Sequence, residues 1–221
     1  MNIEDKIFRS PRLVSNLIFE RFIDVFGTNI STVVNISGWE DSDKDGRRYF
    51  DYFKQIKLKK YDISNVGGYR GAVSQNQLCI DLDDRSFLAE PFYDLVFCHT
   101  VLEHVFDLFN AVRILSDLSS RFVFCVVPHV QQSHSTEDFG DYWRFNKEGI
   151  ERLFLNQGIT SWVSLYAERN GSSSYLCFIG SKCDQDQASF DKIFSSNDEP
   201  KFVKNGLLFY ATRLWRKLRK Y

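Results

Sequence analysis

The sequence predicts an α/β protein whose sheet is doubly wound and mostly parallel. Two runs, Leu95–Phe97 and Phe122–Val127, are nearly all apolar, as strands buried on both faces are. Between them, apolar residues recur at helical spacing: Leu108, Ala111, Val112, Leu115 and Leu118. A strand, a helix and a second strand in this order form the βαβ unit of a parallel sheet. We therefore expect strands at Leu78–Leu82, Tyr93–Cys98 and Arg121–Val127.

Composition narrows the class of protein. A chain of 221 residues is long enough for one domain with short appendages. Its 28 basic and 29 acidic residues nearly balance, so the whole chain does not resemble a nucleic-acid binder. The five cysteines show no zinc-site spacing, and the 21 phenylalanines suit a thick core. With no signal-peptide pattern and no long apolar stretch, we expect a cytoplasmic protein without a spanning segment.

Three parts are expected along the chain. Residues 1–30 form an N-terminal helical segment, with Pro11 in the first turn, Gly27 at the end and a stripe of Leu13, Leu17, Ile18, Phe22 and Val25. Residues 31–182 form the main domain. Residues 183–221 form a linker and a basic amphipathic helix. Such a helix suits binding to a membrane surface, such as the inner face of the cell membrane, or to an acidic partner, or packing against its own domain.

Within the main domain, the first strand ends in a turn at Asn35-Ile36-Ser37-Gly38. Residues 41–54 are expected to be helical, with Tyr49, Phe50 and Phe53 facing inward, and the alternating run Ile56–Asp62 is expected to be the second strand. Asn146 is placed to cap a helix that runs to about Gln157. Two strands, Thr160–Glu168 and Ser173–Gly180, flank an Asn-Gly turn and predict an antiparallel hairpin at the end of the sheet.

Several of these segments together resemble a known family. Asp81-Leu82, Phe92-Tyr93-Asp94-Leu95-Val96, Val101-Leu102-Glu103-His104-Val105 and Asp141-Tyr142-Trp143-Arg144-Phe145 resemble segments of class I S-adenosylmethionine-dependent methyltransferases, particularly members that act on small molecules and in glycan pathways. The resemblance implies a Rossmann-like fold and S-adenosylmethionine as cofactor. The chain departs from the family pattern in having one glycine in the turn after the first strand and no Pro-Gly-Gly turn before the fifth.

The resemblance also implies the cofactor-binding residues. Asn35, Ser37 and Gly38 would lie beside the methionyl part, where close backbone approach favours glycine. Asp62, which follows Gly38 by 24 residues, close to the ~20 typical of dinucleotide sites, is the candidate for the ribose hydroxyls. Asp81 and Leu82 would meet the adenine, with Asp83 and Asp84 as alternatives to Asp81. Cys98 and His99 would lie where the methionyl end meets the substrate.

The long polar segment from Pro128 to Phe145 holds the expected catalytic residues. We predict His129 and His134 as general bases, Asp141 as the carboxylate that orients them, and Tyr142 and Arg144 as substrate-binding residues, Arg144 for an anionic group. Glu103 and His104 are interpreted as mainly structural, and no metal site is expected.

The predicted function is O-methylation of a sugar, nucleotide-sugar or glycan-type acceptor. The alternative is a methyltransferase-like module that binds or scaffolds without catalysis. A dinucleotide-dependent oxidoreductase is disfavoured because GxGxxG is absent, and nucleic-acid methylation because no element for holding a flipped base is present.

Overall fold

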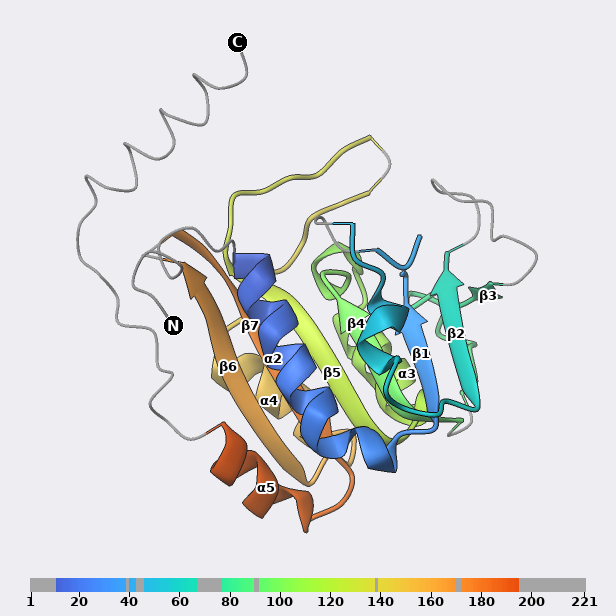
Figure 1. The fold of residues 1–221 in the computed structure, drawn as a ribbon. Coiled ribbons are helices and arrows are strands. Elements are labelled where there is room, and N and C mark those ends of the chain that lie inside the picture. The colour runs from blue at the N-terminus through green and yellow to red at the C-terminus, as the bar shows by residue number, and fades with distance from the viewer. Residues whose placement is uncertain are drawn as a thin grey trace.

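A computed structural model describes residues 11–38, 40–42, 46–66, 77–89, 92–137, 139–169 and 172–194. A central sheet of seven strands has the order β3-β2-β1-β4-β5-β7-β6 (Figure 1). The strands are β1 (Thr32–Ile36), β2 (Lys60–Asn65), β3 (Leu78–Cys79), β4 (Tyr93–His99), β5 (Ser119–Val130), β6 (Ser161–Arg169) and β7 (Ser172–Ser181). The first five run parallel, and β7 is antiparallel to both β5 and β6. The predicted fold class is confirmed.

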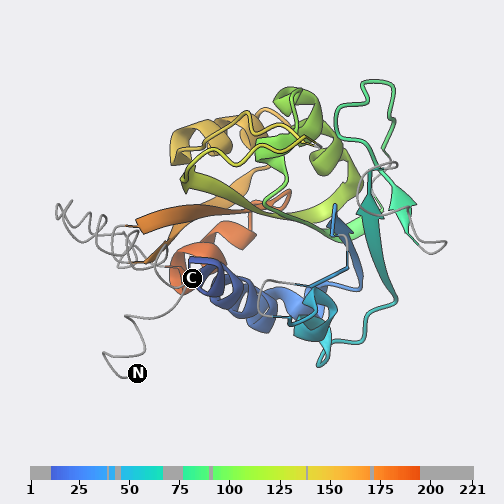
Figure 2. The same ribbon diagram turned by 90° about the horizontal axis from the view of Figure 1, so that it is seen from above.

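Helices cover both faces of the sheet (Figure 2). One face carries α3 (Leu108–Leu118) and α4 (Lys147–Leu155), and the other carries α2 (Pro11–Phe26) and α5 (Asp186–Ile193). Short 3-10 helices lie at η1 (Gly27–Asn29), η2 (Tyr49–Phe53) and η3 (Leu102–His104). As predicted, Asn146 caps α4 by accepting a hydrogen bond from the backbone N–H of Gly149 at 2.7 Å.

Each face has its own hydrophobic core. The five apolar residues predicted for the α3 stripe are all buried between α3 and the sheet. On the other face the core is largely aromatic, because Phe19, Phe22 and Phe26 of α2 meet phenylalanines of the central strands. The ring of Phe19 stacks on Phe97 at 4.4 Å, and that of Phe26 lies 5.2 Å from Phe122.

This aromatic packing sets the rotation of α2 on the sheet. Leu17 and Val25, two residues of the predicted apolar stripe, are each 42% exposed, whereas Phe19 and Phe26 are buried. The predicted stripe was therefore only partly right. Phenylalanine side chains bury more apolar area than Leu or Val, so they decide which side of the helix faces the strands.

The helix predicted for residues 41–54 is wrong. Ser42 and Arg48 instead form an isolated β-bridge, and of the described residues in this segment only those of η2 are helical. Asp41 has a positive φ of 58° and its carboxylate accepts a hydrogen bond from the backbone of Phe50, so the side chain competes with regular helix formation. The expected burial holds for Tyr49 and Phe53 but not for Phe50, which is 40% exposed.

The linker predicted from residue 183 is also wrong over α5. Phe190 is fully buried and its ring lies 5.1 Å from that of Phe26, so α5 belongs to the main domain. Asp186 fixes the start of the helix by accepting hydrogen bonds from Arg121 at 2.8 Å and from the Ser181 hydroxyl at 2.5 Å. The basic helix predicted within residues 201–221 lies outside the described residues.

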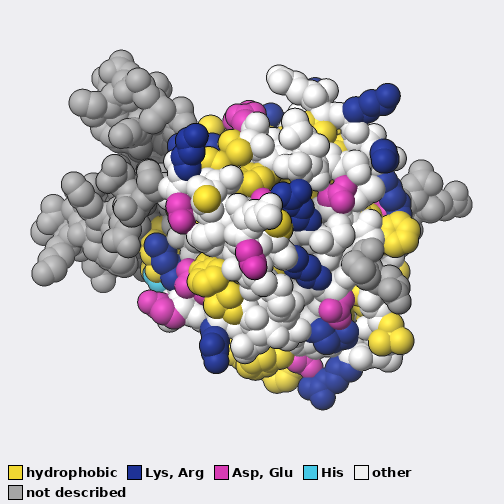
Figure 3. All heavy atoms as spheres, turned by 90° about the horizontal axis from the view of Figure 1, so that it is seen from below, with side chains coloured by type: hydrophobic (Ala, Val, Ile, Leu, Met, Phe, Trp, Pro, Cys, Tyr) yellow, Lys and Arg dark blue, Asp and Glu magenta, His cyan; other side chains and the backbone are white. Residues whose placement is uncertain are grey.

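The surface carries both charge signs. On the face seen from below, Lys and Arg side chains are interspersed with Asp and Glu (Figure 3). Among the described residues, no helix combines the length and the apolar character that crossing a membrane requires.

Candidate active site

Two unusual turns meet at the carboxyl edge of the sheet. The strand order reverses between β1 and β4, and Ile36 of β1 pairs with Cys98 of β4. Just past these strands, Ser37 and Thr100 both adopt positive φ values, 52° and 54°, which non-glycine residues rarely do. Ligands of open α/β sheets bind at such a reversal, and backbone strain gathers at functional sites.

The Asn35 side chain stabilises the first of these turns. It is buried and its Nδ2 donates a hydrogen bond to Asp41 at 3.0 Å. A Cβ on Gly38 would lie 2.5 Å from that Nδ2, so Gly38 must be glycine because the Asn35 amide fills the space. The Ser37 and Gly38 backbone N–H groups donate to Ser64 on β2. Of the three residues predicted to meet the methionyl group, Asn35 therefore serves the turn itself.

Asp41 is the centre of this support, and sequence reasoning missed it. Its carboxylate is buried, accepts hydrogen bonds from the Tyr61 hydroxyl and the Phe50 backbone, and lies 3.7 Å from Arg48. Burial, reinforced by the neighbouring Asp41 charge, raises the pKa of Tyr61 above its ordinary value. No local pattern in the sequence connects Asp41 with Tyr61, because the fold brings them together across 20 residues.

Asp62 does not lie at the carboxyl edge. It is inside β2, where its carboxylate accepts a hydrogen bond from Tyr93 at 2.5 Å and lies 2.9 Å from Lys60 Nζ. Tyr93 is the first residue of β4, so the Asp62 side chain serves the amino half of the sheet. The second strand begins later than predicted, which moves Asn65 to the edge. The prediction that Asp62 binds the ribose is wrong on this geometry.

Asp81 lies where it was predicted, directly beyond β3, and its side chain is exposed. It accepts a hydrogen bond from the Asp83 backbone at 2.9 Å, whereas Asp83 itself receives the backbone N–H of Asp107. Asp81 is thus the better placed of these acids for a ligand. The Leu82 side chain is buried, which leaves only its backbone for contact with a ring.

Cys98 and His99 point to opposite faces of the sheet. Cys98 is buried on the α3 side beside Cys125, and burial raises the pKa of the Cys125 thiol. His99 faces α2, where its Nε2 lies 3.3 Å from the Ser15 hydroxyl and its Nδ1 lies 3.3 Å from the Thr100 hydroxyl. Only His99 of this pair borders the strained turn.

The start of α2 contacts the turn at Thr100. The Arg12 guanidinium donates to the Thr100 hydroxyl at 3.1 Å and lies 5.7 Å from the centre of the Tyr175 ring. Arg12 and Ser15 were not predicted, because they lie outside the apolar stripe expected for this helix. Their only sequence signal is polarity on the helix face next to that stripe.

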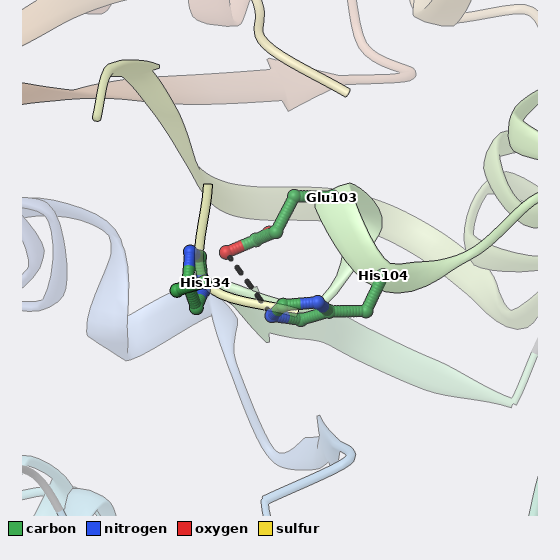
Figure 4. A group of neighbouring side chains, drawn as sticks. All are labelled: Glu103, His104 and His134. Atoms are coloured by element: carbon green, nitrogen blue, oxygen red, sulfur yellow. Dashed lines mark ion pairs between the residues drawn. The ribbon is translucent and has the colours of Figure 1, made fainter. Parts of the chain in front are cut away.

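A second group of polar residues lies beside η3. Glu103 and His104 of η3 and His134 of the loop after β5 point toward one another (Figure 4). The His134 backbone N–H donates to Asp141 at 2.8 Å, and its Nδ1 lies 3.2 Å from the same oxygen. Asp141 therefore orients His134, as predicted. Burial raises the pKa of Glu103 to about 7 and lowers that of His104.

His129 has other neighbours. Its Nδ1 donates to the Phe145 carbonyl at 2.5 Å, and its ring lies 4.7 Å from that of Tyr166 on β6. The structure pairs Asp141 with His134 and not with His129.

The segment from Asp141 to Phe145 fastens this loop to η3. The Tyr142 backbone N–H donates to the Glu103 carbonyl at 2.7 Å, and the Trp143 indole donates to the Val105 carbonyl at 2.9 Å. The Tyr142 side chain remains 51% exposed, which suits the predicted substrate contact.

The Arg144 guanidinium forms its hydrogen bonds with other groups of the protein. Its terminal nitrogens donate to the two Asp141 oxygens at 2.5 and 2.7 Å, and its Nε donates to the Gln131 carbonyl at 3.0 Å. The guanidinium holds the pKa of Asp141 well below its usual range. These contacts argue against the predicted role of Arg144 in binding an anion.

No family model and no curated protein matches the sequence, but solved structures match the fold. The 1,6-didemethyltoxoflavin-N1-methyltransferase of Burkholderia thailandensis, solved with 1,6-didemethyltoxoflavin and S-adenosylhomocysteine, is 12% identical, with a TM-score of 0.55 over 79% of this chain and 78% of that one. The magnesium protoporphyrin IX methyltransferase of Synechocystis PCC 6803, solved with S-adenosylhomocysteine, is 12% identical, with a TM-score of 0.54 over 81% and 88%. This chain has the fold of class I S-adenosylmethionine-dependent methyltransferases. A third match is the N-terminal domain of EvdMO1 in the presence of S-adenosylhomocysteine and D-fucose, which is 11% identical, with a TM-score of 0.50 over 78% and 83%.

The residues of this methyltransferase fold suit S-adenosylmethionine at two places. The strained turn at Ser37 and Gly38 offers backbone next to the switch point, and Asp81 offers an exposed carboxylate beyond β3. The carboxylate predicted for the ribose is absent from the described end of β2, where Asn65 donates to Gln77 at 2.7 Å.

Proposed function

We propose that this protein is an S-adenosylmethionine-dependent methyltransferase that methylates a hydroxyl group of a sugar, nucleotide-sugar or glycan-type acceptor. The observation that carries the proposal is the pair of strained turns at Ser37 and Thr100, which flank the switch point of a methyltransferase fold. The match to the EvdMO1 domain, crystallised in the presence of D-fucose, supports the choice of a sugar-type acceptor.

In this proposal the cofactor spans the carboxyl edge. Ser37 and Gly38 approach its methionyl part, and Asp81 accepts a hydrogen bond from the adenine amino group. Methyl transfer is a displacement in line with the bond that breaks, so the protein's main task is alignment of acceptor and methyl group. His99, Thr100 and Arg12 are the side chains that border the methionyl end.

A hydroxyl acceptor must also lose a proton. We assign this activation to the pair of His134 and Asp141, because the structure joins them and leaves His129 packed on Tyr166. The exposed Tyr142 ring and the adjacent Phe106 ring, whose centres lie 5.4 Å apart, supply an apolar surface on which a sugar ring can pack.

Calorimetric titration of the purified chain with S-adenosylmethionine and with S-adenosylhomocysteine tests the proposal. We expect micromolar binding that Asp81→Ala weakens ~10-fold or more, because one hydrogen bond to a charged group is lost. Asp84→Ala is the matched control, since Asp84 is also exposed but bonds to Ser86 in its own loop. The absence of binding at millimolar cofactor would overturn the proposal in favour of a non-catalytic scaffold.

A further inference from the structure

We propose that Glu103, His104 and His134 bind a divalent transition-metal ion. One potential ligand atom of each residue lies within 4.8 Å of the others, with two residues from η3 and the third from the loop after β5 (Figure 4). Two imidazoles and one carboxylate form the donor set that Mn²⁺, Fe²⁺ and Zn²⁺ accept, whereas Mg²⁺ and Ca²⁺ prefer oxygen alone.

The Glu103 carboxylate is the strongest sign that a cation belongs here. The residue is 1% exposed, and its Oε2 is buried without a hydrogen-bond partner among the described residues. A buried carboxylate oxygen without a donor is costly. The nearby arginines do not satisfy it by hydrogen bonding: Arg144 donates to Asp141, Arg12 donates to Thr100 through Nη2, and Arg12 Nε has no hydrogen-bond partner among the described residues.

His104 is prepared as a ligand by its other neighbour. Its Nδ1 donates to the Gly140 carbonyl at 2.6 Å, which leaves the lone pair on Nε2. His104 Nε2 lies 3.8 Å from Glu103 Oε1, too far for a hydrogen bond between the two atoms. Two hydrogen-bond acceptors this close to each other are unfavourable. A cation between the two atoms would be coordinated by both and would remove this cost. A backbone carbonyl on the far ring nitrogen is the usual support for a metal-bound histidine.

His134 is supported in the same way by a carboxylate. Asp141 accepts the His134 backbone N–H and lies 3.2 Å from its Nδ1, so Nε2 is the nitrogen that remains for an ion. Arg144 fixes Asp141 in turn through two hydrogen bonds. The contacts from Arg144 through Asp141 to His134 therefore fix the imidazole ring of His134 without a bound ion.

The ion's chemical role rests on the function proposed above. Coordination lowers the pKa of a hydroxyl, so the acceptor oxygen can lose its proton to water at neutral pH. That oxygen then forms a bond to the methyl carbon while the carbon–sulfur bond breaks and its electron pair stays on sulfur, which yields a methyl ether and S-adenosylhomocysteine. His134 and Asp141 would thus activate the acceptor through the ion that they position.

Titration of the chelator-treated full chain with Mn²⁺ alone and with Zn²⁺ alone tests the site without any acceptor. We expect one ion per chain with a Kd of ~1–100 μM. Asp141→Asn should weaken binding ~10–100-fold, as loss of an outer partner does, and Glu103→Gln and His134→Ala should weaken it further. Glu103→Gln keeps the shape of the side chain, so it remains informative if His134→Ala lowers stability. His129→Ala is the control, because His129 lies outside the cluster and should leave binding unchanged.

Two outcomes would overturn the site: no binding of either ion at about 1 mM, or binding that Glu103→Gln leaves unchanged. S-adenosylmethionine binding, measured in parallel with chelator present, keeps the two proposals apart. Cofactor binding without ion binding would overturn the metal site alone. Ion binding without cofactor binding would overturn the proposed methyltransferase activity and leave the metal site standing.

Discussion

Asp94, in the segment Phe92–Val96 that resembles methyltransferases, is predicted to stabilise the fold from the edge of the sheet opposite the candidate site. One carboxylate oxygen, Oδ2, accepts hydrogen bonds from the Ser31 backbone and hydroxyl, both at 2.8 Å, and from the Thr32 backbone at 3.0 Å. These bonds join the start of β4 to the start of β1. Partial burial acts to raise the pKa of Asp94, but the hydrogen bonds outweigh it and lower the pKa below its ordinary value.

The substitution Asp94→Asn keeps the shape of the side chain and removes the charge. A hydrogen bond to a charged group contributes about 1 kcal/mol more than one to a neutral group, and partial exposure reduces that difference. Over three bonds we expect a loss of about 1–2 kcal/mol in the free energy of unfolding at pH 7. The folded-state pKa lies below the unfolded value of ~3.9, so this contribution is complete above pH ~4 and disappears as the pH falls through the folded-state value.

Urea denaturation of both proteins between pH 7 and pH 3 measures this difference. The exposed Asp24→Asn, which removes the same charge from the outer side of α2, should stay within about 0.5 kcal/mol of wild type. Equal stability of Asp94→Asn and wild type at pH 7 would refute the reasoning. A difference that persists unchanged at pH 3 would show that the replacement of an acceptor oxygen by an amide NH2 group, and not the loss of charge, is responsible.

Two further predictions concern α5 and the turn after β1. Phe190→Ala should lower the free energy of unfolding by about 3–5 kcal/mol, because the ring is fully buried against Phe26, while Phe109→Ala at a 70% exposed position should have little effect in the same thermal or urea assay. Gly38→Ala should cost about 1–3 kcal/mol and weaken S-adenosylmethionine binding, because the new Cβ must displace the buried Asn35 amide. Unchanged stability of Phe190→Ala or of Gly38→Ala would contradict the packing at that residue.

The sequence was most informative where burial is directly visible in residue type. The apolar runs of β4 and β5, the α3 stripe and the Asn146 cap all reflect contacts that every strand or helix of that kind must make. The linker prediction failed because α5 is short and polar on most sides. Its buried apolar contacts are Phe190 and, just past its end, Phe194, with Ile193 partly buried, and these are too few to produce a periodic signal.

The site was less predictable than the fold because its residues interact across long separations. The position of Asp62 depended on where β2 begins, and a shift of a few residues moved its side chain away from the carboxyl edge. Arg144 was expected to face a ligand, yet its partner lies three residues earlier in the same loop. Residue type alone does not distinguish an arginine that binds substrate from one that supports a neighbouring carboxylate.

The distribution of satisfied and unsatisfied charge separates the two edges of the sheet. At the amino edge, Asp94 accepts hydrogen bonds from Ser31 and Thr32, and Asp62 accepts one from Tyr93 and lies beside Lys60 Nζ. At the carboxyl edge, Glu103 keeps a buried oxygen to which none of the described residues donates, and Ser37 and Thr100 hold strained backbone. Such costs persist in a folded protein only where the surrounding structure enforces them, and they are typical of functional sites. The same contrast explains why removal of a charge at Asp94 should destabilise the protein, whereas its removal at Glu103 should chiefly weaken the binding of an ion.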